Sequence, residues 1–382
     1  MEILITRLFF LLCFLSVSGQ AARFIPERDD MILATLEPTE TTNQALHTYW
    51  QKNPEHPDLA LAMTQELLSH YAKSLDVRYL GRAMAVLRPW WKLRTPPNKI
   101  LLARARIKQS LHLFHESLED FDLAITRNPT GQAYLSRSTV YLVLGKLDKA
   151  RKDCESLGQR VSPLILETCL APIRSQQGEG KQVLSSLPFI IAQSQTDKNL
   201  AAWAWGVVAE IAYHWNDPKA GQYYAKAIDL EPEDGYNLTA YADYLLSEQK
   251  PKRVVALLKD AEQDSALLRL GLAYRQLKDP KFNEVLAKLS ERFREAKQRH
   301  SDLHLREQAW FTFHLQDKPN EAMSLAQQNW KTQKEPQDME LLVRISRALG
   351  EDLPQELLLH LKKRSLLPFL QPKPRDLAGE KQ

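Results

Sequence analysis

Glycine is scarce in this chain, at 13 of 382 residues, and cysteine is scarcer still, at 3. The chain is 44% hydrophobic and 26% charged. Low glycine content with this balance of apolar and charged residues favours a folded, helix-rich protein over a disordered one. We therefore expect a helical, folded chain.

Charge of one sign is nowhere concentrated. The 51 basic and 47 acidic residues give a net charge of +4 and are dispersed along the sequence. A nucleic-acid-binding protein would carry a concentrated basic stripe. We interpret the charges as solvated helix faces and expect no nucleic-acid partner.

Catalytic and metal-binding motifs are also missing. The run Gly178-Glu179-Gly180-Lys181 has no Ser or Thr after its lysine, lacks the longer glycine spacing of a phosphate loop and follows no strand, so it is interpreted as a helix–helix turn. His300 and His304, with Glu307 nearby, have neither the HExxH pattern nor a convincing third ligand. We expect no enzyme, no metal and no cofactor.

No hydrophobic run is long enough to span a bilayer. Residues 8–17 form an apolar core of about ten residues, short of the ~20 that a spanning helix needs and within the range of a signal-peptide core. Gly19-Gln20-Ala21 offers a cleavage site. This pattern predicts export to the periplasm or outside the cell, with an uncleaved anchor or a buried core helix as alternatives.

Export would leave two cysteines in the mature chain, because Cys13 lies in the signal segment. Cys154 and Cys169 are expected on consecutive helices, and an oxidising compartment permits one disulfide between them. The alternative is that both are small, buried core residues with free thiols.

What the chain does have is a repeated helical pattern. The stretch 201–235 reads as two helices with a break at 216–218. Its second helix carries Ala220, Tyr224 and Ala227 on one face, at +4 and +7, and a proline at +12 ends it. The small residue lets the preceding helix approach closely, and the two residues after it fill the space alongside.

The same +4, +7, +12 ladder recurs from Ser117, and equivalent positions recur down the chain at steps of 33, 33, 37 and 34. The pattern resembles the tetratricopeptide repeat (TPR), a helix–turn–helix unit of about 34 residues. The resemblance implies an all-α, right-handed solenoid of about eight stacked hairpins, whose first helices line a concave groove that binds peptides or proteins. The equivalent residues are Ser117, Ala150, Val183, Ala220 and Val254.

These patterns predict four segments. Residues 1–21 are a signal peptide and residues 22–57 an N-terminal connector. Residues 58–364 form the solenoid, and residues 365–382 form a loosely ordered C-terminal tail.

Aromatic residues crowd into two of the repeats, and most of them are interpreted as core. Trp205 is expected to be offset from the face that carries Val208, and so to stand partly exposed in the groove. By the TPR resemblance, further residues would share that face. The residues expected to bind a partner are Arg106, Thr139, Trp205, Ala209, Tyr213, Asp243 and Arg275.

Together these features predict an exported scaffold that binds a protein or peptide partner in the cell envelope through a concave groove. The alternative is a glycan-binding envelope protein that uses groove aromatics, Trp205 and Tyr213, as sugar platforms. The mature chain is expected to contain no transmembrane segment.

Overall fold

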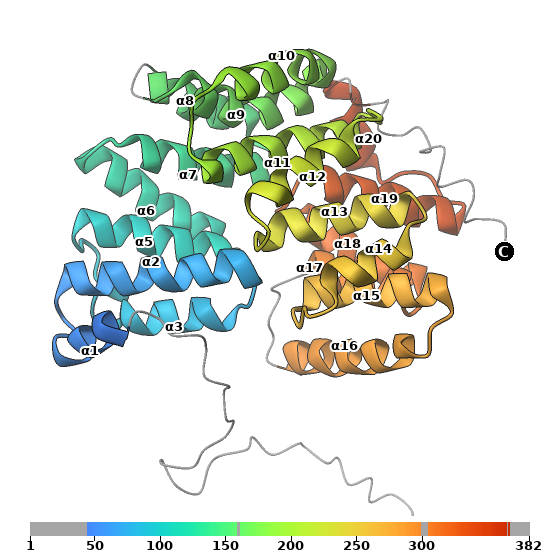
Figure 1. Cartoon of the computed structure of the whole chain (residues 1–382), viewed down its shortest axis with the longest axis horizontal. Helices are drawn as coiled ribbons and strands as arrows, with labels where there is room; N and C mark the ends of the chain where they lie inside the picture. The colour runs from blue at the N-terminus through green and yellow to red at the C-terminus, as the bar shows by residue number, and fades with distance from the viewer. Residues whose placement is uncertain (1–43, 159–160, 299–304, 365, 367–382) are drawn as a thin grey trace, which may run out of the picture. The chain divides into compact units, whose positions relative to one another are not determined.

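The computed structural model describes residues 44–158, 161–298, 305–364 and 366 (Figure 1). The expected signal peptide, most of the connector, nearly all of the tail, and the pair His300 and His304 lie outside these residues. One compact unit begins at Ala45, and it is described here by itself.

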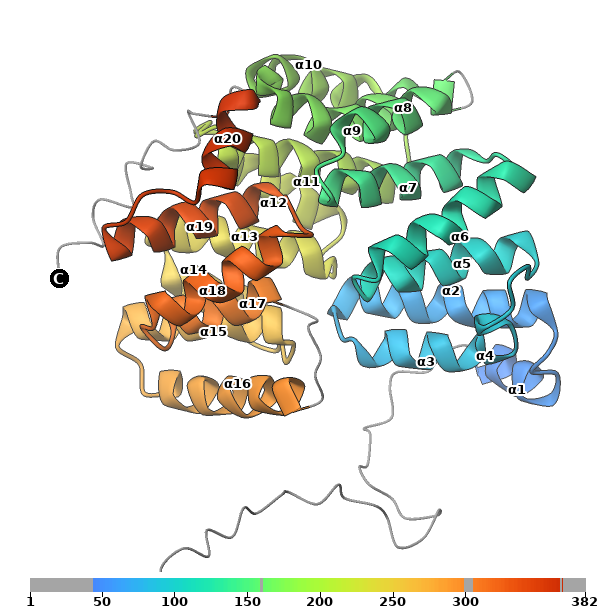
Figure 2. The ribbon, with the colours of Figure 1, turned by 180° about the vertical axis from the view of Figure 1, so that it is seen from behind.

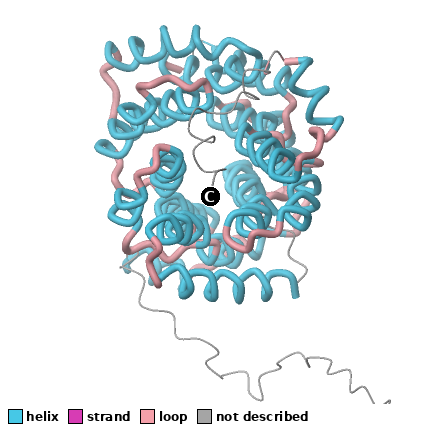
Figure 3. The backbone as a smooth tube through the Cα atoms, turned by 90° about the vertical axis from the view of Figure 1, so that its right-hand side faces the viewer, coloured by secondary structure: helices cyan, strands magenta, loops and turns pink. Residues whose placement is uncertain are grey.

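Every regular element in the described part of the chain is a helix (Figure 3). The first half contains α1 (Gln44–Lys52), α2 (Pro57–Ser74), α3 (Arg78–Val86), α4 (Arg88–Trp91), α5 (Asn98–Ser110), α6 (Phe114–Arg127), α7 (Gly131–Val143), α8 (Leu147–Leu157), α9 (Pro163–Arg174), the π-helical turn η2 (Ser175–Glu179) and α10 (Gly180–Gln193). The second half contains α11 (Lys198–His214), α12 (Ala220–Leu230), α13 (Gly235–Ser247), α14 (Pro251–Leu258), α15 (Asp264–Leu277), α16 (Lys281–Gln298), α17 (Leu305–His314), α18 (Pro319–Trp330), α19 (Pro336–Leu349) and α20 (Gln355–Lys363).

Consecutive helices pair as the repeat pattern predicts. Within the described ranges, eight pairs pack together, from α2/α3 and α5/α6 to α17/α18, and α19 and α20 follow them. The predicted all-α solenoid of TPR-like hairpins is therefore confirmed. No helix in the described part of the chain is both long enough and apolar enough to cross a membrane.

The ladder residues occupy the close contacts between paired helices. Ser117 and Ala220 are almost fully buried, as are Phe121 and Tyr224 four residues after them. The Ser117 hydroxyl donates a hydrogen bond of 2.8 Å to the carbonyl of Ala105 in the preceding helix. A small residue at this position allows the helices to approach, and the large residue beside it fills the remaining space.

The predicted turn at 178–181 is present between α9 and α10. Gly178 adopts φ of +93°, a conformation that side chains rarely allow. A Cβ atom on Gly180 would lie 2.1 Å from the Trp215 indole nitrogen, so only glycine fits there. That indole nitrogen donates a hydrogen bond of 2.9 Å to Ser175 Oγ, which fixes the turn against α11.

The first hairpin lies against a helix from the middle of the chain. α2 contacts α13, and a Cβ atom on Gly235 would stand 2.7 Å from the carbonyl oxygen of Lys73. The Lys73 ammonium pairs with Glu233 at 2.8 Å. The superhelix therefore brings its beginning beside a repeat that is about 160 residues away in the sequence.

Helices α17 to α20 have a hydrophobic core of their own, centred on Trp330, Leu342 and Leu361. A larger core runs from α9 to α17 and includes Tyr224 and Phe311. Figure 2 shows α17 to α19, in orange and red, on the side of α13 to α15 that faces away in Figure 1.

Cys154 in α8 and Cys169 in α9 form a disulfide, with 5.8 Å between their Cα atoms. This separation is within the range that a disulfide requires. The bond joins the hairpin α7/α8 to the next hairpin, α9/α10.

Candidate functional site

A cavity of about 1130 Å³ lies inside the compact unit, between helices from its beginning, middle and end. The C-terminal end of α2 and the turn after it form one wall, α13 and α15 form another, and α17 and α19 a third. Five aromatic side chains line it: Tyr71, Tyr213, Tyr236, Trp310 and Phe313.

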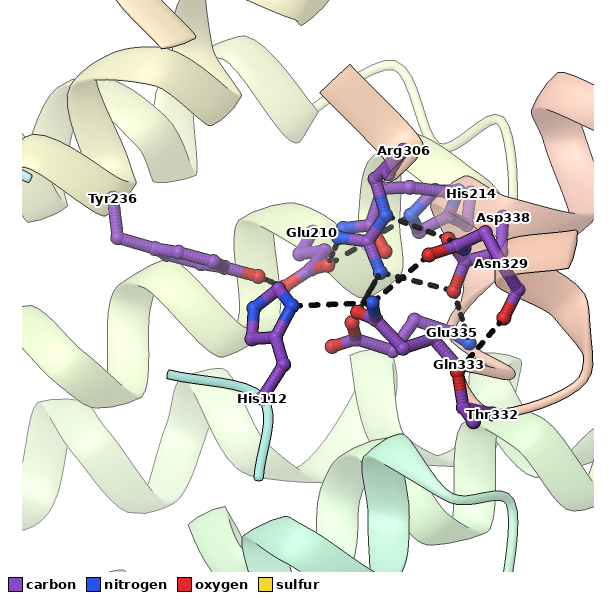
Figure 4. Close-up of polar contacts among 11 residues, drawn as sticks. His112, Glu210, His214, Tyr236, Arg306, Asn329, Thr332, Gln333, Glu335 and Asp338 are labelled. Carbon is purple, nitrogen blue, oxygen red and sulfur yellow. Dashed lines mark hydrogen bonds and ion pairs between the residues drawn. The ribbon is translucent and has the colours of Figure 1, made fainter. Parts of the chain in front are cut away.

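Tyr236 is the most exposed of the large apolar side chains in this lining, at 51%. It lies in the first turn of α13, which begins at that point because the Asp234 side chain accepts a hydrogen bond of 2.8 Å from the Asn237 backbone N–H. In Figure 4 the Tyr236 side chain extends from α13 toward Glu210. Its hydroxyl donates a hydrogen bond of 3.0 Å to Glu210 Oε2.

Glu210, in α11, is enclosed where three helices meet. It accepts hydrogen bonds from Tyr236 of α13 and from the side-chain amide of Gln337 of α19. Burial raises the pKa of Glu210, the charge of Glu335 raises it further, and the two hydrogen bonds oppose the shift. His214, one turn on, lies 3.9 Å from Glu210 and 3.7 Å from Glu340.

Next to Glu210, Arg306 holds the start of α19 (Figure 4). Its guanidinium donates to both carboxylate oxygens of Asp338, at 2.6 and 2.9 Å, and also to Glu335. Asp338 also accepts from Asn329 Nδ2 at 2.7 Å and from the Glu335 N–H at 2.9 Å. Burial would lower the pKa of Arg306, but the carboxylates of Asp338 and Glu335 outweigh it and raise the pKa. This network fixes one wall of the cavity.

The charged residues around the rest of the cavity are largely paired with one another. The Arg269 guanidinium donates hydrogen bonds of 2.6 and 2.8 Å to the Asp243 carboxylate, and Arg292 donates one of 2.6 Å to Asp264. Because these pairs neutralise one another, the wall offers hydrogen-bonding groups and apolar surface more than a field of one sign.

Two other side chains pack against Trp310, which is partly buried. The His314 ring lies 4.2 Å from it, and the Arg269 guanidinium lies 5.2 Å from its centroid. Burial and the neighbouring Arg344 and Arg275 lower the pKa of His314 to about 3, so this ring is neutral at physiological pH. Trp310 is therefore a packed part of the wall.

The expectation that Trp205 stands exposed in the groove is wrong. Trp205 is 8% exposed and stacks on Tyr223 of α12 with 5.5 Å between ring centroids. The Lys226 ammonium covers the ring at 4.1 Å. The physical reason is helical spacing: a residue three before Val208 lies on nearly the same face of α11, so Trp205 points into its own hairpin.

The other expected binding residues are spread over different environments. Tyr213 and Asp243 line the cavity. Ala209 is fully buried, on a face of α11 where a small side chain allows close packing. Arg106 and Thr139 lie away from the described cavity lining, and burial lowers the pKa of Arg106. Arg275 lies on the surface, where its guanidinium donates a hydrogen bond of 2.9 Å to the Asp317 carboxylate.

Sequence reasoning missed the central residues of this site, which are Tyr236, Glu210 and Arg306. Tyr236 belongs to the aromatic cluster noted in the sequence, but nothing local marked it as exposed. The hydrogen-bond partners of Glu210 and Arg306 lie 26 to 127 residues away, so no short motif contains them. Within the described residues, no group of three or more His, Cys, Asp or Glu side chains could hold a metal ion.

No known family profile matches the chain, and no curated protein matches it. Among solved structures, it is similar to a tetratricopeptide repeat protein from Parabacteroides merdae, with a TM-score of 0.37 and 15% identity over 60% of this chain and 93% of that one. It is also similar to the Cut9–Hcn1 complex of the APC/C (TM-score 0.27, 15% identity, 83% and 75% covered) and to yeast Tom70 (0.26, 11%, 85% and 94%).

Proposed function

We propose that this chain is an exported, non-catalytic scaffold that binds a segment of a protein partner in the cell envelope. The observation that carries the proposal is the Tyr236 ring, which is 51% exposed inside a concave, aromatic-lined cavity. Buried tyrosines at protein interfaces are frequent hot spots, and an exposed ring in a concave wall is a ready anchor for a partner side chain.

The size and chemistry of the cavity favour a short peptide segment over a folded domain. Its volume of about 1130 Å³ is slightly above the usual range for pockets that enclose a small ligand. The paired charges leave polar groups that can bond a peptide main chain, while Tyr71, Tyr213 and Tyr236 offer surface for its side chains. A stacked-hairpin solenoid is suited to holding such a segment because its repeats form a rigid frame.

The buried position of Trp205 weighs against a glycan as the ligand. Trp205, one of the two sugar platforms in that alternative, has no open face, because Tyr223 and Lys226 cover its ring.

Export is supported by the N-terminal apolar segment and by the disulfide between Cys154 and Cys169, since disulfides persist in oxidising compartments. N-terminal sequencing of the native protein should begin near Ala22. A native chain that begins at Met1 and is found in the cytosol would contradict export.

The binding proposal is tested by capture from an envelope extract on the immobilised wild-type protein and on two variants. Tyr236→Ala removes the exposed ring of the cavity, and Tyr49→Ala removes a comparably exposed ring, 63%, on α1. We expect proteins that wild type and Tyr49→Ala retain and Tyr236→Ala loses, identified by mass spectrometry. Equal retention by both variants, or recovery of sugar polymers alone, would contradict the proposal.

A further inference from the structure

The ring of Tyr236 has room for a partner on its face. It is 51% exposed, and no arginine or lysine in the described ranges lies over it. Trp310, in the same cavity, has such a cation: the Arg269 guanidinium lies 5.2 Å from its ring centroid and bonds the Asp243 carboxylate. That arrangement combines an aromatic face, a guanidinium and a carboxylate.

A carboxylate is also present beside Tyr236. Tyr236 and Gln337 both line the cavity, and each donates a hydrogen bond to Glu210, from the Tyr236 hydroxyl at 3.0 Å and from the Gln337 side-chain amide. Figure 4 shows Glu210 at the hydroxyl end of Tyr236. Charges are weakly screened inside a protein, so the field of Glu210 reaches the cavity past these two side chains.

The network around Glu210 contains more carboxylates than cations. Arg306 donates to Asp338 at 2.6 and 2.9 Å and also to Glu335, so one guanidinium already serves two carboxylates. The N-terminus of α19 offsets part of their charge, because both belong to its capping box. Among the described ion pairs, Glu210 has only the His214 imidazole, at 3.9 Å, a ring that is charged only when protonated.

The ionisation of Glu210 reflects the same shortage of positive charge. Burial and the charge of Glu335 raise its pKa above the ordinary glutamate value, although its two hydrogen bonds and Arg306 oppose the shift. A cation placed beside Tyr236 would stabilise the ionised form of Glu210 and lower this pKa.

A guanidinium suits this part of the cavity better than an ammonium group does. Its plane can stack on the exposed Tyr236 ring, as that of Arg269 lies over Trp310, and its charge is attracted by Glu210. The Gln337 side-chain oxygen has no hydrogen-bond partner within the described residues, so the wall also offers an acceptor to N–H groups.

We propose, on the basis of the binding function above, that the segment bound in the cavity presents an arginine side chain to Tyr236. Its guanidinium stacks on the ring, and the carboxylate of Glu210 balances its charge. The partner is therefore a segment that contains arginine.

Selection from a library tests whether the site chooses arginine. Random eight-residue peptides are displayed and selected on the immobilised, disulfide-intact wild-type protein, and the bound peptides are tested again on Tyr236→Ala. We expect arginine to be enriched, and Tyr236→Ala to lose the selected peptides. No selected peptide, or equal binding to Tyr236→Ala, would contradict the binding function itself. Peptides that need Tyr236 and are not enriched in arginine would overturn the arginine assignment alone.

The tightest selected peptide is then synthesised with its arginine, with lysine, and with citrulline, a neutral side chain of similar shape. Binding to wild type is measured by fluorescence anisotropy. Citrulline should weaken binding about tenfold, and lysine about threefold, because lysine keeps the charge and loses the stacking plane. Equal affinity of the arginine and citrulline peptides would show recognition of shape without charge and would overturn the proposal.

Glu210→Gln tests the source of the attraction, since glutamine keeps an acceptor oxygen for the Tyr236 hydroxyl. The variant should bind the arginine peptide about fivefold more weakly and the citrulline peptide as wild type does. Glu284→Gln removes the same charge from an exposed position of α16 outside the cavity lining, and should change either affinity less than about twofold.

Equal losses in Glu210→Gln and Glu284→Gln would show general electrostatic attraction and would overturn the proposal. An equal loss of the arginine and citrulline peptides in Glu210→Gln would mean that Glu210 only holds Tyr236 in place, and would overturn it too. Circular dichroism and a thermal melt establish that both variants are folded.

Discussion

The Tyr236 hydroxyl and the Glu210 carboxylate are joined by a hydrogen bond of 3.0 Å that links the first turn of α13 to the last third of α11. The ring of Tyr236 faces the cavity, while its hydroxyl end is enclosed. Burial and the charge of Glu210 raise the pKa of Tyr236 well above its usual range, so the hydroxyl remains a donor. This hydrogen bond therefore fixes the position of the exposed Tyr236 ring. It also provides the enclosed Glu210 carboxylate with one hydrogen-bond donor.

Glu210 should make stability depend on pH. Its pKa is raised in the folded state, so between the unfolded value, about 4.3, and the folded value the native protein binds more protons than the unfolded chain. Stability from this group therefore falls as pH rises through that window. Glu210→Gln should flatten this part of the curve of unfolding free energy against pH, measured in urea at a series of pH values.

An unchanged slope in Glu210→Gln would mean that the carboxylate ionises as freely in the folded protein as in water. Glu284→Gln is the control, because Glu284 is exposed on α16 and should leave the pH profile as it is.

Trp205→Ala should reduce the free energy of unfolding by about 3–5 kcal/mol, because it removes a large side chain packed between Tyr223 and Lys226 and leaves a cavity. Phe189→Ala is the control: this ring is 63% exposed, and its loss should change stability by about 0.5 kcal/mol or less. A Trp205→Ala protein with the urea midpoint of wild type would show that the indole is not part of the core.

Arg306→Met should cost about 3–5 kcal/mol, since it leaves the buried Asp338 carboxylate without its guanidinium. Arg275→Met makes the same change at an exposed pair with Asp317 and should cost about 0–1 kcal/mol. Adding Asp338→Asn to Arg306→Met should recover part of the loss. A double variant less stable than Arg306→Met alone would contradict this account.

Reducing the bond between Cys154 and Cys169 should lower stability by about 2–4 kcal/mol, because the bond restricts the unfolded chain over a separation of 15 residues. Thiol counting on the denatured native protein should find no free thiol at these positions. Two free thiols would mean that both cysteines are simply small core residues.

The repeat pattern could be predicted from the sequence because it records contacts between neighbours. Ser117, Ala150, Val183, Ala220 and Val254 recur at near-constant spacing, and all five are buried where one helix meets the next. Such contacts join residues within one or two repeats, so the sequence period itself carries them.

The direction in which the Trp205 side chain points could not be predicted from the sequence. An offset of Trp205 from Val208 would place Trp205 in the groove, yet a spacing of three residues places both on one side of a helix. Only the packing of α12 decided that this side faces the hairpin interior.

The sequence by itself determined an all-helical chain of stacked hairpins, their small contact residues, and a cysteine pair on consecutive helices. The tertiary structure alone decided that the connector after α18 and Arg364 after α20 lie against the end of α7, and that a cavity lies between Tyr236 and Arg306. The physical reason is distance along the chain. Contacts such as Lys334 with Val143, and Gln337 with Glu210, join residues more than a hundred positions apart, and they depend on small rotations summed over many repeats.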